Sequence, residues 1–212
     1  MEFRKYFDHT NLNQNSTKAD IDKLIDEAIE LDTKSVCVNP CYVIYAKKRL
    51  KDTDIKVCTV VGFPLGMSTT ETKLFETKNA IENGADEIDM VINIGKLLDK
   101  DYDFVYNEVS EIKKCCGKKI LKCIIETALL NDEEIITASK LISDAKADFV
   151  KTSTGFAKRG ASVHDIDLIK SAVSGETKIK AAGGIGTKEY AKELIAHGAS
   201  RIGTSRTNSI LK

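Results

Sequence analysis

The chain has few residues that break regular structure or join separate domains. It contains two prolines among 212 residues and no long tract rich in serine and glycine. No apolar run approaches the roughly 20 residues that a membrane-spanning helix requires. Residues 1–5 are not followed by the apolar core of a secretion signal. We therefore expect a cytosolic protein with one compact domain over residues 1–212, long enough for a sizeable hydrophobic core.

The sequence also lacks an excess of charge of either sign. Its 32 basic residues balance 32 acidic ones, which argues against a nucleic-acid partner or an anionic membrane surface. Its six cysteines form no Cys-x-x-Cys pair and its three histidines are scattered, so we expect no zinc site. We also expect no bound cofactor. Cys37, Cys58 and Cys123 lie in apolar stretches and resemble small core residues rather than disulfide partners.

Short apolar segments alternate with longer amphipathic segments along the whole chain. Ile21, Leu24, Ile25 and Ala28, for example, form one apolar stripe at helical spacing. The predicted strands are a short segment at 8–10 and the ranges 35–38, 55–61, 87–92, 120–126, 149–152, 178–182 and 200–203. The predicted helices are 17–29, 42–50, 70–83, 101–115, 131–146, 162–173 and 187–197. This alternation is typical of βαβ units and a parallel sheet.

The number of strands favours a closed barrel. A weak internal repeat places Gly84-Ala85-Asp86 and Lys146-Ala147-Asp148 at helix ends 62 positions apart, the length of two βα units. Eight strands close a (β/α)8 TIM barrel, an α/β fold for which 212 residues is compact. An open doubly wound sheet is the alternative, but no Gly-x-Gly-x-x-Gly turn follows the first strand.

Charged residues gather where several predicted strands end. Lys151 closes an apolar strand, and a buried ammonium without a partner tends to lose its proton and become an amine nucleophile suited to a Schiff base. Ligands bind at the carboxyl ends of strands in parallel α/β folds. Such a cluster could be purely structural, with acids and lysines that only pair with one another. Buried ion pairs add little net stability, however, so we favour a catalytic role for the cluster. Its predicted members are Glu87, Asp89, Lys122, Lys151 and Lys180, with Glu126 on the same strand face as Lys122.

Two glycine-containing turns narrow the substrate class. Gly183-Gly184-Ile185-Gly186 and Gly203-Thr204-Ser205 follow the last two predicted strands, where barrels commonly bind phosphate. Exposed backbone amides in such turns can surround a phosphate next to the N-terminus of a helix. We therefore expect a phosphorylated small molecule with an electrophilic carbonyl.

Seven motifs in order resemble the deoxyribose-phosphate aldolase family. The two lysine motifs are Val150-Lys151-Thr152-Ser153-Thr154-Gly155-Phe156 and Ile179-Lys180-Ala181-Ala182-Gly183-Gly184-Ile185. The others are Asp8-His9-Thr10, Val36-Cys37-Val38-Asn39-Pro40, Val61-Gly62-Phe63-Pro64-Leu65-Gly66, Glu87-Ile88-Asp89-Met90-Val91 and Arg201-Ile202-Gly203-Thr204-Ser205. The resemblance covers residues 8 to about 205, nearly the whole chain.

The resemblance implies a (β/α)8 barrel and a metal-independent class I aldolase (a lyase). Such an enzyme reversibly cleaves 2-deoxy-D-ribose 5-phosphate to acetaldehyde and D-glyceraldehyde 3-phosphate, in deoxynucleoside catabolism. It implies Lys151 as the Schiff-base lysine, Lys180 as a neighbouring cation that favours its neutral form, and Asp89 as the proton-transfer acid. A homodimer is a further expectation. Together with the positions of residues at the strand ends, the resemblance predicts which residues contact the substrate or its phosphate: Asp8, Thr152, Gly183, Gly184, Gly203, Thr204 and Ser205.

Three features of the sequence differ from the family pattern or have a role that the pattern does not decide. Arg206 stands where the family usually has a small residue, and it either contacts the phosphate or points to solvent. Some relatives have a C-terminal tyrosine that assists protonation, whereas residues up to Lys212 provide none, so we expect Asp89, Lys180 and water to serve that step. Cys37 matches a family cysteine near the substrate, but its apolar surroundings favour a packing role.

Two other functions remain open at this point. One is a Schiff-base aldolase of the barrel class that acts on a different sugar phosphate. The other is a phosphate-binding barrel in which the lysines only hold the ligand. Release of acetaldehyde and formation of a covalent adduct separate these from the first interpretation.

Overall fold

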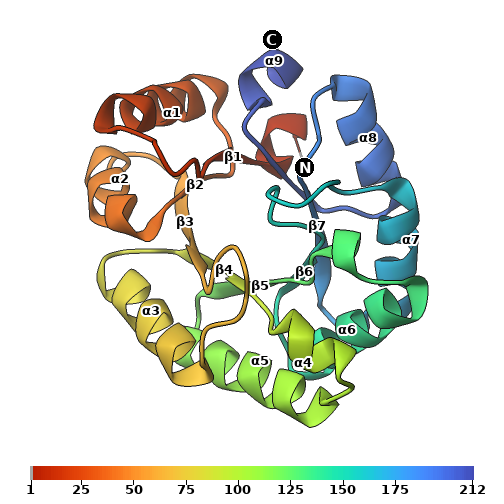
Figure 1. Cartoon of the computed structure of the whole chain (residues 1–212). Helices are drawn as coiled ribbons and strands as arrows, with labels where there is room; N and C mark the ends of the chain where they lie inside the picture. Colours follow the sequence, from red (N-terminus) through yellow and green to blue (C-terminus); the bar gives the residue numbers. More distant parts are fainter. Residues whose placement is uncertain (1) are drawn as a thin grey trace.

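The computed structural model describes residues 2–212, and its centre is a closed barrel of eight parallel strands (Figure 1). The strands are β1 (Phe7–Asn11), β2 (Ser35–Val38), β3 (Lys56–Val61), β4 (Glu87–Val91), β5 (Ile120–Ile124), β6 (Phe149–Lys151), β7 (Lys178–Ala182) and β8 (Arg201–Thr204). Each strand pairs with the next in the sequence, and β8 pairs with β1. The predicted barrel is confirmed, and the open-sheet alternative is wrong.

Helices surround the barrel on the outside (Figure 1). The α-helices are α1 (Lys18–Leu31), α2 (Val43–Arg49), α3 (Thr70–Glu82), α4 (Ile94–Leu98), α5 (Tyr102–Cys116), α6 (Asp132–Asp144), α7 (Val163–Ala172), α8 (Lys188–His197) and α9 (Thr207–Leu211). Three short 3-10 helices are η1 (Phe3–Tyr6), η2 (Pro40–Tyr42) and η3 (Thr127–Leu129). Within residues 2–212, no helix has the length and apolar character needed to cross a membrane.

Local sequence sets where several helices begin. The Thr17 hydroxyl accepts a hydrogen bond from the Asp20 backbone N–H, and the Asp20 carboxylate accepts one from the Thr17 backbone N–H. The same reciprocal capping pattern starts α6 with Asn131 and α7 with Ser162. A cap of this kind stabilises a helix by about 1 kcal/mol, because it satisfies backbone N–H groups that have no partner within the helix.

The structure differs from the sequence prediction at a few boundaries. The predicted helix at 42–50 is preceded by η2, and two five-residue helices, α4 and α9, were not predicted. The predicted strand at 120–126 ends at Ile124, because Glu126 takes a left-handed backbone conformation with φ 51°. Glu126 therefore does not continue the strand face that carries Lys122.

The strands send every second side chain into the barrel, and the two sides of that interior differ. On β2 and β3 the interior contains Cys37, Cys58 and Val60, which pack together. The arc formed by β1 and β4–β8 carries charged side chains instead. The strand register brings several of them together: Asp89 pairs with Lys122, and Lys151 pairs with Lys180.

Candidate active site

Within residues 2–212, seven charged side chains form a buried cluster in the barrel interior. Lys122 Nζ lies 2.7 Å from the Glu87 carboxylate and 2.8 Å from that of Asp89. Arg201 Nη1 lies 2.6 Å from Asp8 and 3.0 Å from Glu87. The cluster consists of the cations Lys122, Lys151, Lys180 and Arg201 and the carboxylates Asp8, Glu87 and Asp89.

Asp89 is the point at which the three lysines of the cluster meet. Lys151 Nζ donates to Asp89 Oδ2 at 2.8 Å, and Lys180 Nζ donates to the same oxygen at 2.7 Å. Lys122 donates to the other oxygen, Oδ1. The nitrogens of Lys151 and Lys180 are therefore about 5.5 Å apart at most, close enough for strong repulsion if both carry a charge.

The pairing leaves Lys151 as the surplus cation. Lys122 contacts two carboxylates, Lys180 contacts Asp8 and Asp89, and Arg201 also contacts two. Lys151 contacts only Asp89, which it shares with the other two lysines. Three carboxylates balance three of the four cations, so the cluster becomes neutral when Lys151 gives up its proton.

Two other members of the cluster, Asp89 and Lys180, are strongly biased toward their charged forms. Burial alone would raise the pKa of Asp89, but the ammonium groups of Lys122, Lys151 and Lys180 outweigh it and hold that pKa well below its usual range. Burial alone would lower the pKa of Lys180, but the carboxylates of Asp8 and Asp89 outweigh it and raise that pKa above its usual value. Both groups are thus charged in the resting site, Asp89 as a carboxylate and Lys180 as an ammonium.

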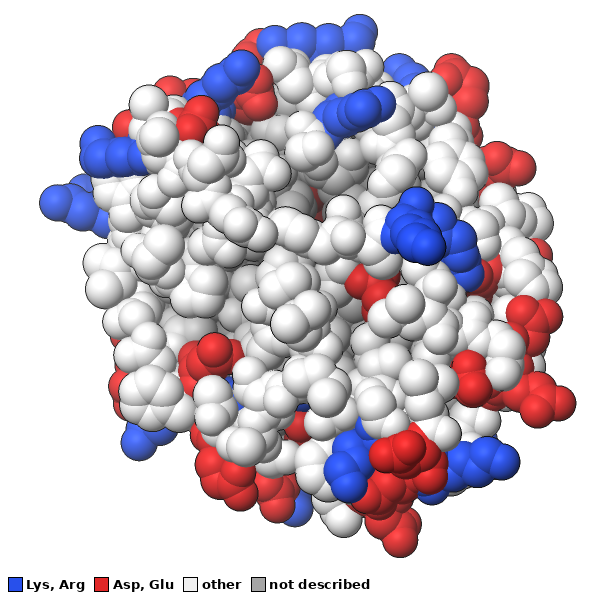
Figure 2. Space-filling model, in the orientation of Figure 1, with Lys and Arg blue, Asp and Glu red and all other residues white. Residues whose placement is uncertain are grey.

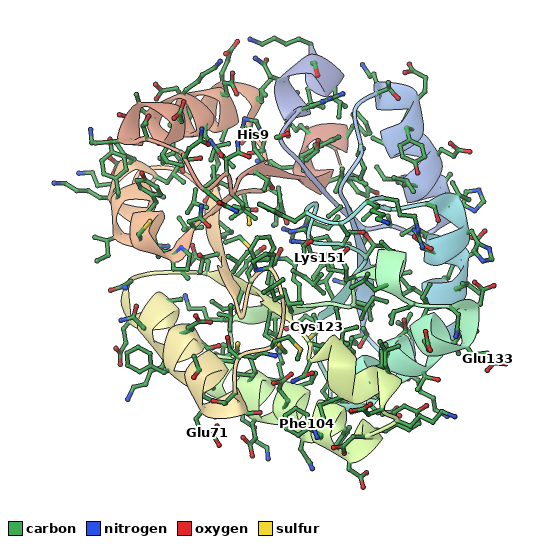
Figure 3. The ribbon with its side chains drawn as sticks, in the orientation of Figure 1. His9, Glu71, Phe104, Cys123, Glu133 and Lys151 are labelled. Carbon is green, nitrogen blue, oxygen red and sulfur yellow. The ribbon has the colours of Figure 1, made fainter. Side chains whose placement is uncertain are left out.

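A pocket of about 290 Å³ opens over this cluster. Lys151 lines the pocket, whereas Lys122, Lys180 and Asp89 lie beneath its surface. Figure 3 shows Lys151 within the ring of strands, while Glu133 lies at the periphery.

The centre of the face in Figure 2 is hollowed and mostly uncharged, and Lys, Arg, Asp and Glu side chains gather toward its rim. The lining residues are Thr10, Asn11, Leu12, Asn13, Lys151, Thr154, Gly155, Phe156, Ala182, Gly183, Gly184, Ile185, Gly203, Thr204, Ser205 and Arg206.

The two glycine-containing turns form one side of the pocket. Gly183 and Gly184 have φ of +80° and +73°, a conformation that side chains rarely adopt, and it bends the chain directly after β7. Gly203 packs against Lys180, whose Cε lies 3.1 Å from where a Cβ would stand. The Thr204 hydroxyl donates to the Ile185 carbonyl at 2.7 Å and ties the two turns together. The predicted phosphate residues of both turns are therefore neighbours.

Two predicted contact residues are not exposed to this pocket. Asp8 is fully buried in the cluster, where it accepts from Ser35 at 2.6 Å and pairs with Arg201 and Lys180. Thr152 is also fully buried, and its hydroxyl donates to the Ala182 carbonyl and accepts from the Ala182 N–H. Neither side chain lines the pocket, so in this structure both contact neighbouring protein groups, and their contact with the substrate remains a prediction.

Cys37 and Glu126 also have defined surroundings near the site. Cys37 and Cys58 are register partners on β2 and β3, and Cys58 donates to Asp89 at 3.1 Å. The Cys37, Cys58 and Asp89 ligand atoms lie within 4.8 Å of one another, but the lysines that donate to both Asp89 oxygens create a field that disfavours a metal cation. The Glu126 carboxylate accepts a bond from the Thr154 backbone N–H at 3.2 Å and so holds one wall of the pocket.

Comparison with known proteins agrees with this geometry. Residues 3–205 match the DeoC/LacD family aldolase model. A deoxyribose-phosphate aldolase of Lactococcus lactis is 51% identical over 212 residues, which is all of this chain and 96% of the relative. One of Finegoldia magna is 54% identical over 97% of this chain and 96% of the relative. The tetrameric deoxyribose phosphate aldolase of Aeropyrum pernix superposes with a TM-score of 0.91 at 31% identity, covering 98% of this chain and 88% of that one.

The chain belongs to the DeoC/LacD aldolase family. The family resemblance expected from the motifs is thus confirmed. In this DeoC/LacD aldolase the sequence motifs contain every charged member of the interior cluster except Lys122, which the strand-face argument identified. The sequence did not indicate that Asp8 and Arg201 belong to the cluster. Asp8 was expected to contact the substrate, and no role was expected for Arg201.

Proposed function

We propose that this chain is a class I aldolase that reversibly cleaves 2-deoxy-D-ribose 5-phosphate to acetaldehyde and D-glyceraldehyde 3-phosphate through a Schiff base on Lys151. The observation that carries this proposal is that one buried amine of the cluster lines the pocket. Of the cluster's four cations, Lys151 is the one that lines the pocket, and it is also the surplus charge. An amine that reaches the substrate and whose protonation its neighbours oppose is suited to nucleophilic attack on a carbonyl. The names of the relatives that match over the full chain support this substrate.

The first half of the reaction builds an electron sink. The neutral Lys151 amine attacks C1 of the open-chain aldehyde, and loss of water from the carbinolamine leaves an iminium. The positive charge of that iminium lies beside the Asp89 carboxylate, which contacts Lys151 Nζ at 2.8 Å. Because Asp89 is buried and already ionised when the iminium forms, it stabilises the iminium without reorganisation of solvent.

The second half breaks and remakes bonds at C2. A proton leaves the C3 hydroxyl, the C2–C3 bond electrons move to the iminium, and D-glyceraldehyde 3-phosphate departs from the enamine. Protonation of the enamine at C2 and hydrolysis then release acetaldehyde and free Lys151. Asp89 lies beneath the pocket, so we assign it a relay role: protons pass between it and the substrate through Lys180 or water.

The glycine turns supply the phosphate site in this proposal. The lining residues Gly183, Gly184, Gly203, Thr204 and Ser205 lie on the side of α8 and α9, and their backbone amides bind the phosphate in this proposal. The N-terminal end of α8, a ten-residue helix, follows the first turn and adds a partial positive charge. The pocket lining includes no carboxylate, so nothing in it repels an anionic substrate.

Borohydride trapping followed by intact-mass measurement and peptide mapping tests the proposal. With 2-deoxyribose 5-phosphate, we expect a covalent adduct on Lys151 and release of acetaldehyde. Lys151→Leu should retain the fold but lose the adduct and at least about 10⁴-fold in turnover, the loss expected when a covalent nucleophile is removed. Lys178→Leu is the matched control, because Lys178 is an exposed lysine on β7.

Three outcomes of this experiment would refute parts of the proposal. An adduct on Lys122 or Lys180 would overturn the assignment of the nucleophile. Adducts with another sugar phosphate, without acetaldehyde, would indicate a different aldolase, and tight binding without any adduct would indicate a phosphate-binding barrel. The single-domain organisation, the cytosolic location and the homodimer remain predictions from the sequence.

A further inference from the structure

Arg206 differs from the other arginines of the chain in its lack of a carboxylate partner. Within residues 2–212, no Asp or Glu oxygen lies within 4.0 Å of its guanidinium, and its side chain makes no hydrogen bond there. Only its backbone N–H is engaged, at 3.0 Å from the Thr204 hydroxyl. The other four arginines each pair with at least one carboxylate: Arg4, Arg49, Arg159 and Arg201.

Arg206 contributes one of two positive charges to the pocket lining. The other charge is Lys151 at the floor, and the lining between them contains the backbone of both glycine-containing turns. Because no carboxylate lines this pocket, the Arg206 guanidinium is not neutralised by any other side chain there. A group bound by the two turns lies next to a cation whose five N–H donors are unused.

Gly186 shows where the guanidinium lies. A Cβ on Gly186 would stand 2.8 Å from Arg206 Nη1 and 3.7 Å from Cζ. The side chain therefore crosses from the turn after β8 to the turn after β7 and packs on the Gly186 backbone. This path spans both phosphate turns, and the absence of a side chain at position 186 makes room for it.

We propose that Arg206 is the residue that discriminates a phosphorylated substrate from its unphosphorylated counterpart. This inference rests on the proposed function, since it takes the phosphate to lie at the two glycine turns. The guanidinium donates to the outer phosphate oxygens, while the backbone amides of the turns hold the inner ones. A planar fork of N–H donors matches a phosphate dianion and gains much less from a neutral hydroxyl.

Steady-state kinetics with 2-deoxyribose 5-phosphate and with 2-deoxyribose test this inference. Arg206→Gln retains much of the side chain's length but removes the charge and the fork. We expect the ratio of the two kcat/KM values, phosphorylated over unphosphorylated, to fall about tenfold, through KM rather than kcat. Arg206→Lys retains the charge and should recover part of the ratio, and the difference from wild type should shrink at high salt.

Gly186→Ala provides a second test that leaves Arg206 in place. The new methyl group displaces the guanidinium, because the atom it meets is the far end of a flexible side chain. We expect a smaller fall in the same ratio, and no additional fall when Gly186→Ala is combined with Arg206→Gln, since the two substitutions act on one interaction. Arg4→Gln, at an exposed arginine of η1, is the matched control and should leave the ratio unchanged.

Two results distinguish failure of this inference from failure of the proposed function. If wild type forms no Lys151 adduct with 2-deoxyribose 5-phosphate, the proposed function is wrong. If wild type forms the adduct but Arg206→Gln keeps the wild-type ratio of kcat/KM values, only the role of Arg206 is overturned. Competition by inorganic phosphate gives a second readout: its inhibition constant against borohydride trapping with 2-deoxyribose 5-phosphate should rise about tenfold in Arg206→Gln, and an unchanged constant would also overturn the role.

Discussion

Replacement of Lys122 by methionine should slow formation of the Schiff base on Lys151. Lys122 is fully buried, does not line the pocket and contacts Glu87 and Asp89. Its removal leaves three cations and three carboxylates in the interior, so Lys151 is no longer a surplus cation but a needed partner of Asp89. The variant therefore holds Lys151 more firmly in its ion pair with Asp89, and attack on the aldehyde must break a stronger interaction.

The structure sets the size of this effect. Lys122 and Lys151 donate to opposite oxygens of the Asp89 carboxylate, each at 2.8 Å. Their nitrogens are thus at most about 8 Å apart, and at an effective dielectric constant of about 20 two charges at that distance repel by about 2 kcal/mol. Relaxation around the new methionine reduces the effect, so we expect the rate of Schiff-base formation to fall by about tenfold.

The assay is the rate of borohydride trapping with acetaldehyde at neutral pH. Lys73→Met is the matched control: Lys73 is another fully buried lysine, but it pairs with Glu108 at 2.9 Å outside the barrel. The control should lose about 3–5 kcal/mol of stability without slowing the trapping reaction. Equal slowing in both variants, or an unchanged rate in Lys122→Met, would refute the charge-balance argument.

Two further substitutions test other buried titratable groups, Asp89 and His9. Asp89→Asn removes the carboxylate that three ammonium groups share, so we expect kcat to fall about 10²–10⁴-fold and denaturant titration to show a loss of about 3–5 kcal/mol. Burial lowers the pKa of His9 despite its hydrogen bond to Glu27, so the unfolded chain binds the proton more readily than the folded one. Stability should therefore be full above about pH 6.5 and decline as the pH falls below it, and this decline should be absent in His9→Gln.

The sequence was a good guide to the fold because its periodicities are strong. The strands are short apolar runs and most of the helices have one apolar stripe, so the alternation of elements could be read directly. The two helices that were missed, α4 and α9, have five residues each, too few for a helical period to stand out from the surrounding loop. The early end of β5 was missed as well, because the left-handed conformation of Glu126 has no sequence signature of the kind glycine provides.

The site was predictable only in part, for a different reason. Lys151 ends β6 and Lys180 lies in β7, and each stands in a local motif that was sufficient to locate it. Arg201 begins its strand, and its role depends on its contacts with Asp8 and Glu87 across the barrel. Closure of β8 on β1 brings Asp8 next to it, and that register cannot be read from either strand alone. The surplus of one cation therefore became visible only when the barrel was closed.

The surplus cation of the cluster explains how Lys151 can meet two opposite requirements of the reaction. Lys151 must be neutral to attack the aldehyde, yet the iminium that follows is positively charged at the same nitrogen. Lys122, Lys180 and Arg201 oppose a proton on the free amine, because the three carboxylates are already balanced by these three cations. Asp89, 2.8 Å from the nitrogen, then offsets the charge that covalent chemistry creates there. With one cation fewer, each carboxylate would need its own cation and no amine would be surplus. Without Asp89, the iminium would have no counter-ion, so turnover needs both the surplus amine and the shared carboxylate.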